Sequence, residues 1–127
     1  MNPISVIEEK LKKYPELSYK LTENSISVTP ENGFEVWLNK SAEIFTVGYE
    51  GWHEEFSNPE EALNCFAFGL SEACRLKIIS RNGKPHSWTV QELINGSWVD
   101  SETTGLLLFP FWVKPKINYL QNSIVKI

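Results

Sequence analysis

The stretch FEVWLNKSAEIFTVGYEGWHEEFSNPEEAL, residues 34–63, decides the fold because two extended patterns and a helix start follow one another in it. In residues 34–39 apolar side chains alternate with polar ones and a tryptophan, as in a strand with one face on a core. Residues 43–56 form a second extended run, with Phe45, Val47 and Tyr49 on one side. Residues 39–42 turn the chain between the two runs. The stretch therefore predicts an antiparallel hairpin.

A helix start follows this hairpin directly. Asn58 is a favourable N-cap, Pro59 suits the first helical position, and Glu61 stands where it completes a capping box. Apolar residues then recur at helical spacing as far as Ile78. The pattern predicts one continuous helix over residues 59–79 that packs on a sheet. Gly69 would lie inside this helix, and close contact with a strand is one reason for a glycine there.

The flanking segments complete a set of mostly short strands. Asn2-Pro3 predicts a first helix over residues 4–13, and Asn95-Gly96 predicts a hairpin turn. The apolar run 106–113 contains Pro110, which predicts an edge strand or a bulge, and the residues after Pro115 fit a helix and a strand equally well.

Because no βαβ alternation occurs, we expect an α+β fold in a single domain, residues 1–127. We expect one mainly antiparallel sheet of about six or seven strands, with both helices on one face.

Charge is distributed unevenly along the 127 residues. Residues 1–63 carry 12 acidic and 5 basic side chains, whereas residues 64–127 carry 4 acidic and 7 basic ones. Between Glu31 and Glu61 eight glutamates accompany a single lysine, Lys40. An acidic surface repels phosphate backbones and attracts cations. We therefore expect no nucleic-acid partner.

The composition also argues against a membrane span and a metal site. The longest apolar run, residues 106–113, is far shorter than the roughly 20 residues of a spanning helix. Glu8 and Glu9 argue against a signal peptide, so we expect a cytoplasmic protein with no membrane partner.

Cys65 and Cys74 lie nine positions apart on the predicted helix, on opposite faces, and would stay unpaired. Without a CxxC or Cys/His cluster we expect no metal and no cofactor.

The segment from Gly48 to Phe56 is the densest in polar and aromatic residues. Strand alternation places His53 and Glu55 on one face, with Trp52, Glu54 and Phe56 on the opposite face. A histidine beside a carboxylate can act as a base or a ligand. One hypothesis is therefore a ligand-binding or hydrolytic domain centred on His53 and Glu55, joined by His86 if the two strands pair.

Trp37 supports a different hypothesis, because its strand neighbours place it beside Glu35 on the face away from the core. An exposed tryptophan among acids is typical of an interaction surface. We expect no catalytic residue, since no nucleophile motif occurs. The main prediction is a non-enzymatic interaction protein that binds a cationic protein partner through an acidic, tryptophan-containing sheet face. The predicted contact residues are Glu35, Trp37, Glu50, Trp52, His53 and Glu55.

Small, acidic and rich in aromatic residues, without a catalytic set, the chain resembles bacterial immunity and antitoxin-like proteins in general character. The resemblance implies an inhibitor of a toxin as one concrete form of the interaction protein. A structural subunit without a ligand of its own is the third hypothesis.

Overall fold

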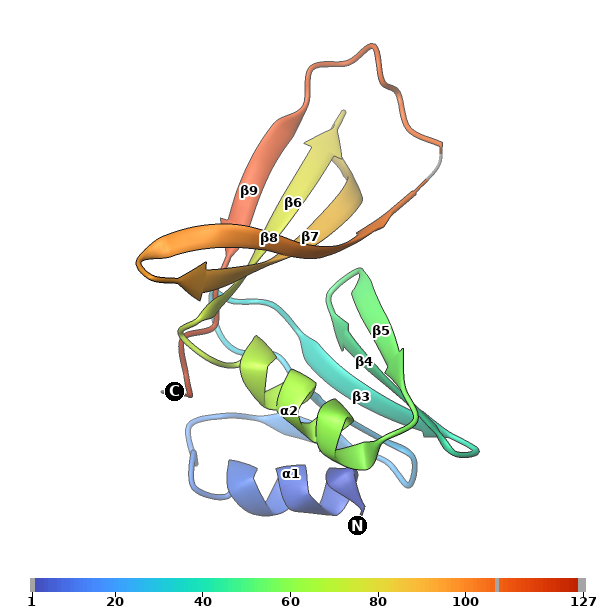
Figure 1. Cartoon of the computed structure of the whole chain (residues 1–127), viewed down its shortest axis with the longest axis vertical. Coiled ribbons are helices and arrows are strands. Elements are labelled where there is room, and N and C mark those ends of the chain that lie inside the picture. The colour runs from blue at the N-terminus through green and yellow to red at the C-terminus, as the bar shows by residue number, and fades with distance from the viewer. Residues whose placement is uncertain (1, 107, 126–127) are drawn as a thin grey trace.

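The computed structural model describes residues 2–106 and 108–125 and shows an α+β fold with two helices and two antiparallel sheets (Figure 1). The first sheet has the strand order β1-β2-β3-β4-β5 and the second has the order β8-β7-β6-β9. The elements are α1 Pro3–Leu11, β1 Tyr19–Leu21, β2 Ser25–Val28, β3 Val36–Ser41, β4 Ile44–Tyr49, β5 Trp52–Phe56, α2 Pro59–Gly69, β6 Cys74–Arg81, β7 Lys84–Ile94, β8 Ser97–Gly105 and β9 Lys116–Leu120. The expected fold class is confirmed, but the single sheet of six or seven strands is wrong.

Both helices cover the same face of the five-stranded sheet (Figure 1). Apolar side chains of β2, β3 and β4 meet α1 and α2 in one core, which includes the fully buried Leu38, Val47 and Phe66. The four-stranded sheet extends away from this layer and contacts it where β7 and β8 meet β5. No helix in residues 2–106 and 108–125 is long and apolar enough to cross a membrane.

Both helices begin within one residue of the predicted positions and at the predicted N-caps, although α1 ends at Leu11 and not at residue 13. The Asn2 side chain accepts a hydrogen bond from the backbone N–H of Ile4 at 3.1 Å, with Pro3 at the first turn. Asn58 accepts from the N–H groups of Glu60 and Glu61 at 2.8 and 3.2 Å. These side chains satisfy backbone donors that the first helical turn leaves without a partner.

The predicted end of the second helix is wrong. α2 ends at Gly69, and the residues from Cys74 form strand β6. Cys74 and Ile78, four residues apart, suit a strand as well as a helix, whereas Leu76 between them fits only the strand period. Gly69 does pack closely, as expected: a Cβ there would overlap the ring of Tyr49.

Both predicted hairpins are present. β3 pairs with β4, and β7 pairs with β8 across Asn95-Gly96, where both residues have positive φ (51° and 81°). That geometry is typical of a two-residue hairpin turn. The long run over residues 43–56 is divided into β4 and β5 by a turn at Glu50, whose φ is 53°.

The apolar run 106–113 does not form the predicted edge strand in its described residues, 106 and 108–113. Its described residues form a loop with local turns, in which the N–H of Phe111 bonds to the carbonyl of Phe109 and that of Val113 to Pro110, both at 2.9 Å. Pro110 has no N–H, and a ladder needs one at alternate positions. The ambiguous tail forms strand β9, which pairs with β6.

The C-terminal segment holds the two layers together. Asn122 donates to the carbonyl of Gly69 at 2.9 Å and accepts from the N–H of Phe34 at 2.8 Å. The carbonyl of Leu70 accepts from the N–H groups of Ile124 and Val125 at 2.8 and 2.9 Å. At the other contact, Trp88 of β7 lies over Gly51, where a Cβ would overlap the indole.

Candidate functional site

The face of the five-stranded sheet opposite the helices carries most of the predicted contact residues. Ser27, Trp37, Gly48 and His53 stand in register on β2, β3, β4 and β5 and form one row across this outer face. Glu55 lies in the next row, opposite Thr46. The predicted placement of His53 and Glu55 on one face of β5 is therefore confirmed.

Trp37 lies over Gly48 in the middle of this row. A Cβ at Gly48 would overlap the indole ring, so the glycine provides the space that the tryptophan occupies. Trp37 is half-buried and does not belong to the hydrophobic core. The C-terminal segment forms its hydrogen bonds with Phe34 and Leu70, as described above. The support beneath the indole is the sheet itself, at Gly48.

Carboxylates lie on the same sheet face as this tryptophan and at the edge of that face. The N–H of Glu35 donates to Glu50 Oε1 at 2.8 Å, and the N–H of Glu50 donates to the carbonyl of Glu35 at 3.0 Å. These bonds hold the Glu50 side chain beside Glu35 at the β4–β5 turn. In the described part of the chain the one ion pair found is Lys12–Glu9 on α1, at 3.5 Å. The carboxylates of the outer face are thus not neutralised within the described chain.

Trp52 is not part of this surface. Its side chain is 4% exposed and stacks on Tyr49, with ring centroids 4.6 Å apart. It lies on the core face of β5, where alternation also places Glu54 and Phe56. Of the six predicted contact residues, five therefore gather on the outer face or its edge, and Trp52 lies in the core.

The two histidines have separate surroundings in different sheets. His53 is exposed on β5, opposite Gly48. His86 is buried on β7, where its Nε2 accepts a hydrogen bond from Arg81 at 2.6 Å and its ring stacks on Phe109. Within residues 2–106 and 108–125, no three His, Cys, Asp or Glu side chains are placed to hold a metal ion.

The cysteines do not share a helix, since Cys74 lies on β6, yet both are free. The Tyr49 hydroxyl donates a hydrogen bond to the carbonyl of Cys65, and its oxygen lies 3.3 Å from Cys65 Sγ. Burial raises the pKa of the Cys65 thiol to about 11 and raises the pKa of Cys74 further. Both thiols are therefore expected to be protonated at neutral pH, the less reactive form.

An acidic cleft between the two sheets is a feature that the sequence did not predict. A cavity of about 330 Å³ lies there, lined by the carboxylates of Glu54, Glu92 and Glu102 and by aromatic side chains that include Trp52. Burial raises the pKa of Glu54, and the nearby charges of Glu102 and Glu61 raise it further. No short-range pattern predicts this cleft, because its walls come from both sheets.

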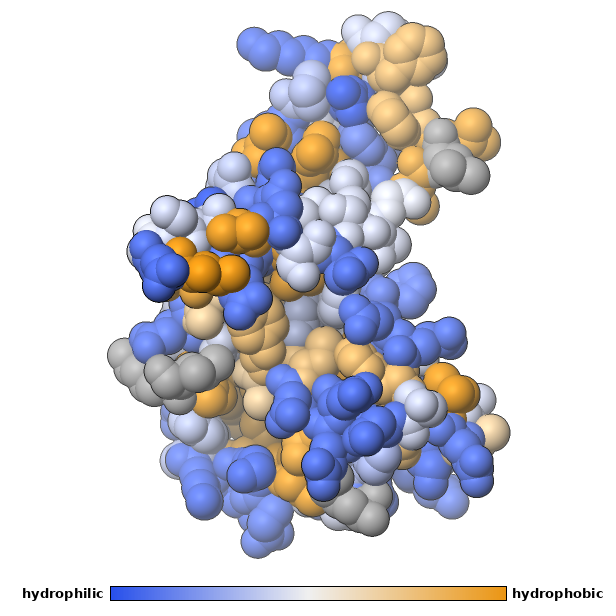
Figure 2. Space-filling view, viewed as in Figure 1, coloured by the Kyte–Doolittle hydropathy of each residue, from blue (hydrophilic) through white to orange (hydrophobic). Residues whose placement is uncertain are grey.

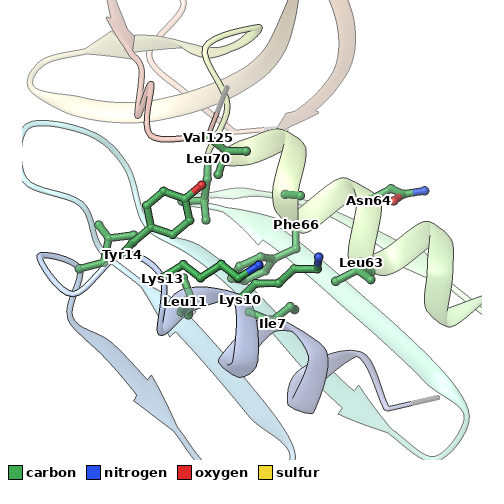
Figure 3. A pocket seen from close by; sticks show the side chains of 12 residues that line it. Ile7, Lys10, Leu11, Lys13, Tyr14, Leu63, Asn64, Phe66, Leu70 and Val125 are labelled. Carbon is green, nitrogen blue, oxygen red and sulfur yellow. The ribbon is translucent and has the colours of Figure 1, made fainter. Parts of the chain in front are cut away.

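A second cavity, of about 420 Å³, lies between α1 and α2 (Figure 3). Its walls are mainly apolar and include Leu11 and Phe66. The side chains of Lys10 and Lys13 extend across it toward α2 (Figure 3). Lysine stems commonly cover apolar surface in this way while the ammonium group stays in water. None of the predicted contact residues lines this groove.

Comparisons with known proteins add no family to this description. The chain matches no protein-family model, no curated protein and no solved structure.

Proposed function

We propose that this chain is a non-enzymatic interaction protein that binds a cationic protein partner through the outer face of its five-stranded sheet. The observation that carries the proposal is the half-buried Trp37 seated over Gly48, with three glutamates on the same sheet face or at its edge. Those glutamates, Glu35, Glu50 and Glu55, have no cationic partner within the described chain. Lys20, paired with Ser27 at the far edge of the row, is the one lysine or arginine that the described register places on this face.

Each part of this surface has a distinct physical role in binding. An indole that rests on a glycine is pre-organised, so its immobilisation on binding costs little conformational entropy. Trp is among the residues that contribute most at protein interfaces. Uncompensated carboxylates accelerate encounter with a basic surface and disfavour acidic partners. An inhibitor of a basic toxin protein is one concrete form of this function.

The proposal places the protein in the cytoplasm, where the free thiols of Cys65 and Cys74 stay reduced. Ligand binding or hydrolysis at His53 and Glu55 has less support, since neither cavity described above includes either residue.

The first test is capture of a partner from cell extract at low and at high salt, followed by kinetics on the purified complex. Trp37→Ala should weaken binding by about 1–2 kcal/mol, mainly through faster dissociation. Trp98→Ala is the matched control, because Trp98 is also half-buried but lies on the other sheet. A partner whose affinity falls equally with both variants would contradict the proposed surface.

Charge is tested separately. The triple variant Glu35→Gln, Glu50→Gln, Glu55→Gln should slow association and flatten its dependence on salt. Gln at position 50 keeps the oxygen that accepts from the Glu35 N–H. Removal of three exposed carboxylates elsewhere (Glu9, Glu16 and Glu23, each to Gln) changes net charge equally and should leave more of the rate intact. Failure to capture any partner would favour the structural-subunit hypothesis.

A further inference from the structure

The loop between β8 and β9 exposes large apolar side chains at the end of the four-stranded sheet. Leu106 is 53% exposed, Leu108 92%, Phe111 74% and Trp112 75%. Figure 2 shows hydrophobic side chains gathered at this end of the molecule, at the upper right of the view. These four residues are here termed the apolar tip. Single exposed apolar residues are ordinary, whereas a contiguous group of this kind marks an interaction site.

The tip is fixed to the sheet by its own loop. Phe109 turns inward and stacks on His86, with ring centroids 4.2 Å apart, and the Arg81 guanidinium lies 4.9 Å from the centroid of the same ring. Arg81 Nε also donates to the carbonyl of Val113 at 2.9 Å, and the N–H of Leu106 donates to the carbonyl of His86 at 2.8 Å. One aromatic ring thus anchors the loop while others point outward.

The charged residues that flank the tip along the chain and at the adjacent β6–β7 turn are all positive. Arg81 and Lys84 pair across the β6–β7 turn at this end of the sheet, and Lys114 and Lys116 follow the loop. Residues 73–91 and 103–127 contain no acidic side chain. The tip therefore combines outward aromatic and aliphatic groups with a cationic rim.

We propose that the apolar tip inserts into the interfacial region of an anionic lipid bilayer and that the cationic rim binds the headgroups. Trp and other aromatic side chains favour the bilayer interface, and basic residues next to it are attracted by anionic lipids. Stable peripheral attachment takes two such signals, and this end of the molecule carries both. The absence of a spanning helix led us to expect no membrane partner, but peripheral attachment requires no span. A second copy on the same tip would place the two cationic rims against each other.

Co-sedimentation of the whole protein with vesicles tests the proposal. Binding is expected to vesicles that contain phosphatidylglycerol and not to phosphatidylcholine alone, and it should weaken with added salt.

Phe111→Ser with Trp112→Ser should reduce the partition coefficient by at least about tenfold, since it removes most of the inserted apolar area. Lys114→Gln and Lys116→Gln should each reduce it about fivefold. Leu21→Ser with Ile44→Ser, exposed positions on the other sheet, is the matched control and should bind normally.

A spectroscopic measurement locates the insertion. Brominated acyl chains should quench the fluorescence of bound wild-type protein, and Trp112→Phe should bind with much of this quenching lost, because the other four tryptophans lie outside the tip. Thermal melting of each variant confirms that it is folded. The proposal is overturned if the folded wild type does not sediment with anionic vesicles. It is also overturned if light scattering shows a dimer that Phe111→Ser and Trp112→Ser dissociate and that anionic vesicles do not.

Discussion

At the scale of single residues, the outer sheet face depends on one glycine. Gly48 is buried beneath Trp37 although it lies on the face away from the core. In a strand a glycine usually weakens the sheet, so its presence calls for a close approach by another group. Here that group is the indole ring, and the same contact sets the height at which Trp37 stands above the sheet.

Gly48→Ala should therefore displace Trp37. The new Cβ overlaps the ring, so we expect a loss of about 1–3 kcal/mol in the free energy of unfolding, together with a red-shifted tryptophan emission. Urea unfolding measures the first quantity and fluorescence the second. Gly105→Ala is the matched control, because a Cβ there meets only the His86 carbonyl oxygen, at an ordinary 3.6 Å. Equal stability of the two variants would show that Trp37 moves aside without cost.

At the scale of elements, local chemistry predicted the starts better than the ends. The Asn58 cap and the Asn95-Gly96 turn depend on residues a few positions apart, and both were predicted correctly. The end of α2 was not, since Cys74 and Ile78, four residues apart, fit both periods, and pairing of their segment with β7 and β9 makes it a strand. Alternation also placed His53 and Glu55 correctly. It also assigned Trp52 to the core face, where the structure has it. The prediction of Trp52 as a contact residue was based on its residue type and not on this alternation.

The shortened α2 still anchors the core, and Phe66 tests how much. Phe66 is fully buried between the sheet and α1, so Phe66→Ala should lower the free energy of unfolding by about 3–5 kcal/mol. The half-buried Phe68, two residues further along the same helix, is the matched control and should lose clearly less on substitution by alanine. Chemical denaturation of the two variants measures the difference. Similar losses would contradict the observed orientation of α2.

At the scale of the whole molecule, the two ends carry opposite charge. The five-stranded layer contains most of the glutamates, and the far end of the four-stranded sheet contains the cationic rim. The two proposals therefore use separate surfaces: a basic protein at the outer face and an anionic bilayer at the apolar tip. Where the layers meet, the acidic cleft brings Glu54 of β5 near Glu102 of β8. Because burial and nearby charges raise the pKa of Glu54, we expect the stability of the fold to depend on pH through this cleft.

Glu54→Gln should show this link. Burial, with Glu102 and Glu61 nearby, raises the pKa of Glu54, so the folded protein holds this proton more tightly than the unfolded chain does. Wild-type stability from this group is therefore present at acidic pH and falls as the pH rises from the ordinary glutamate value, about 4, through the raised pKa. The Gln variant carries no charge and does not suffer this loss. Its free energy of unfolding should exceed that of wild type by an increasing margin toward about pH 7.

Urea unfolding over a pH series measures that margin. Glu55→Gln removes the same charge from the neighbouring position on the outer face, away from the cleft, and is the matched control. Glu102→Gln should reduce the benefit of Glu54→Gln in the double variant, because either substitution relieves the same repulsion. If the curves for Glu54→Gln and Glu55→Gln run parallel to each other across the series, the cleft does not disfavour the Glu54 charge.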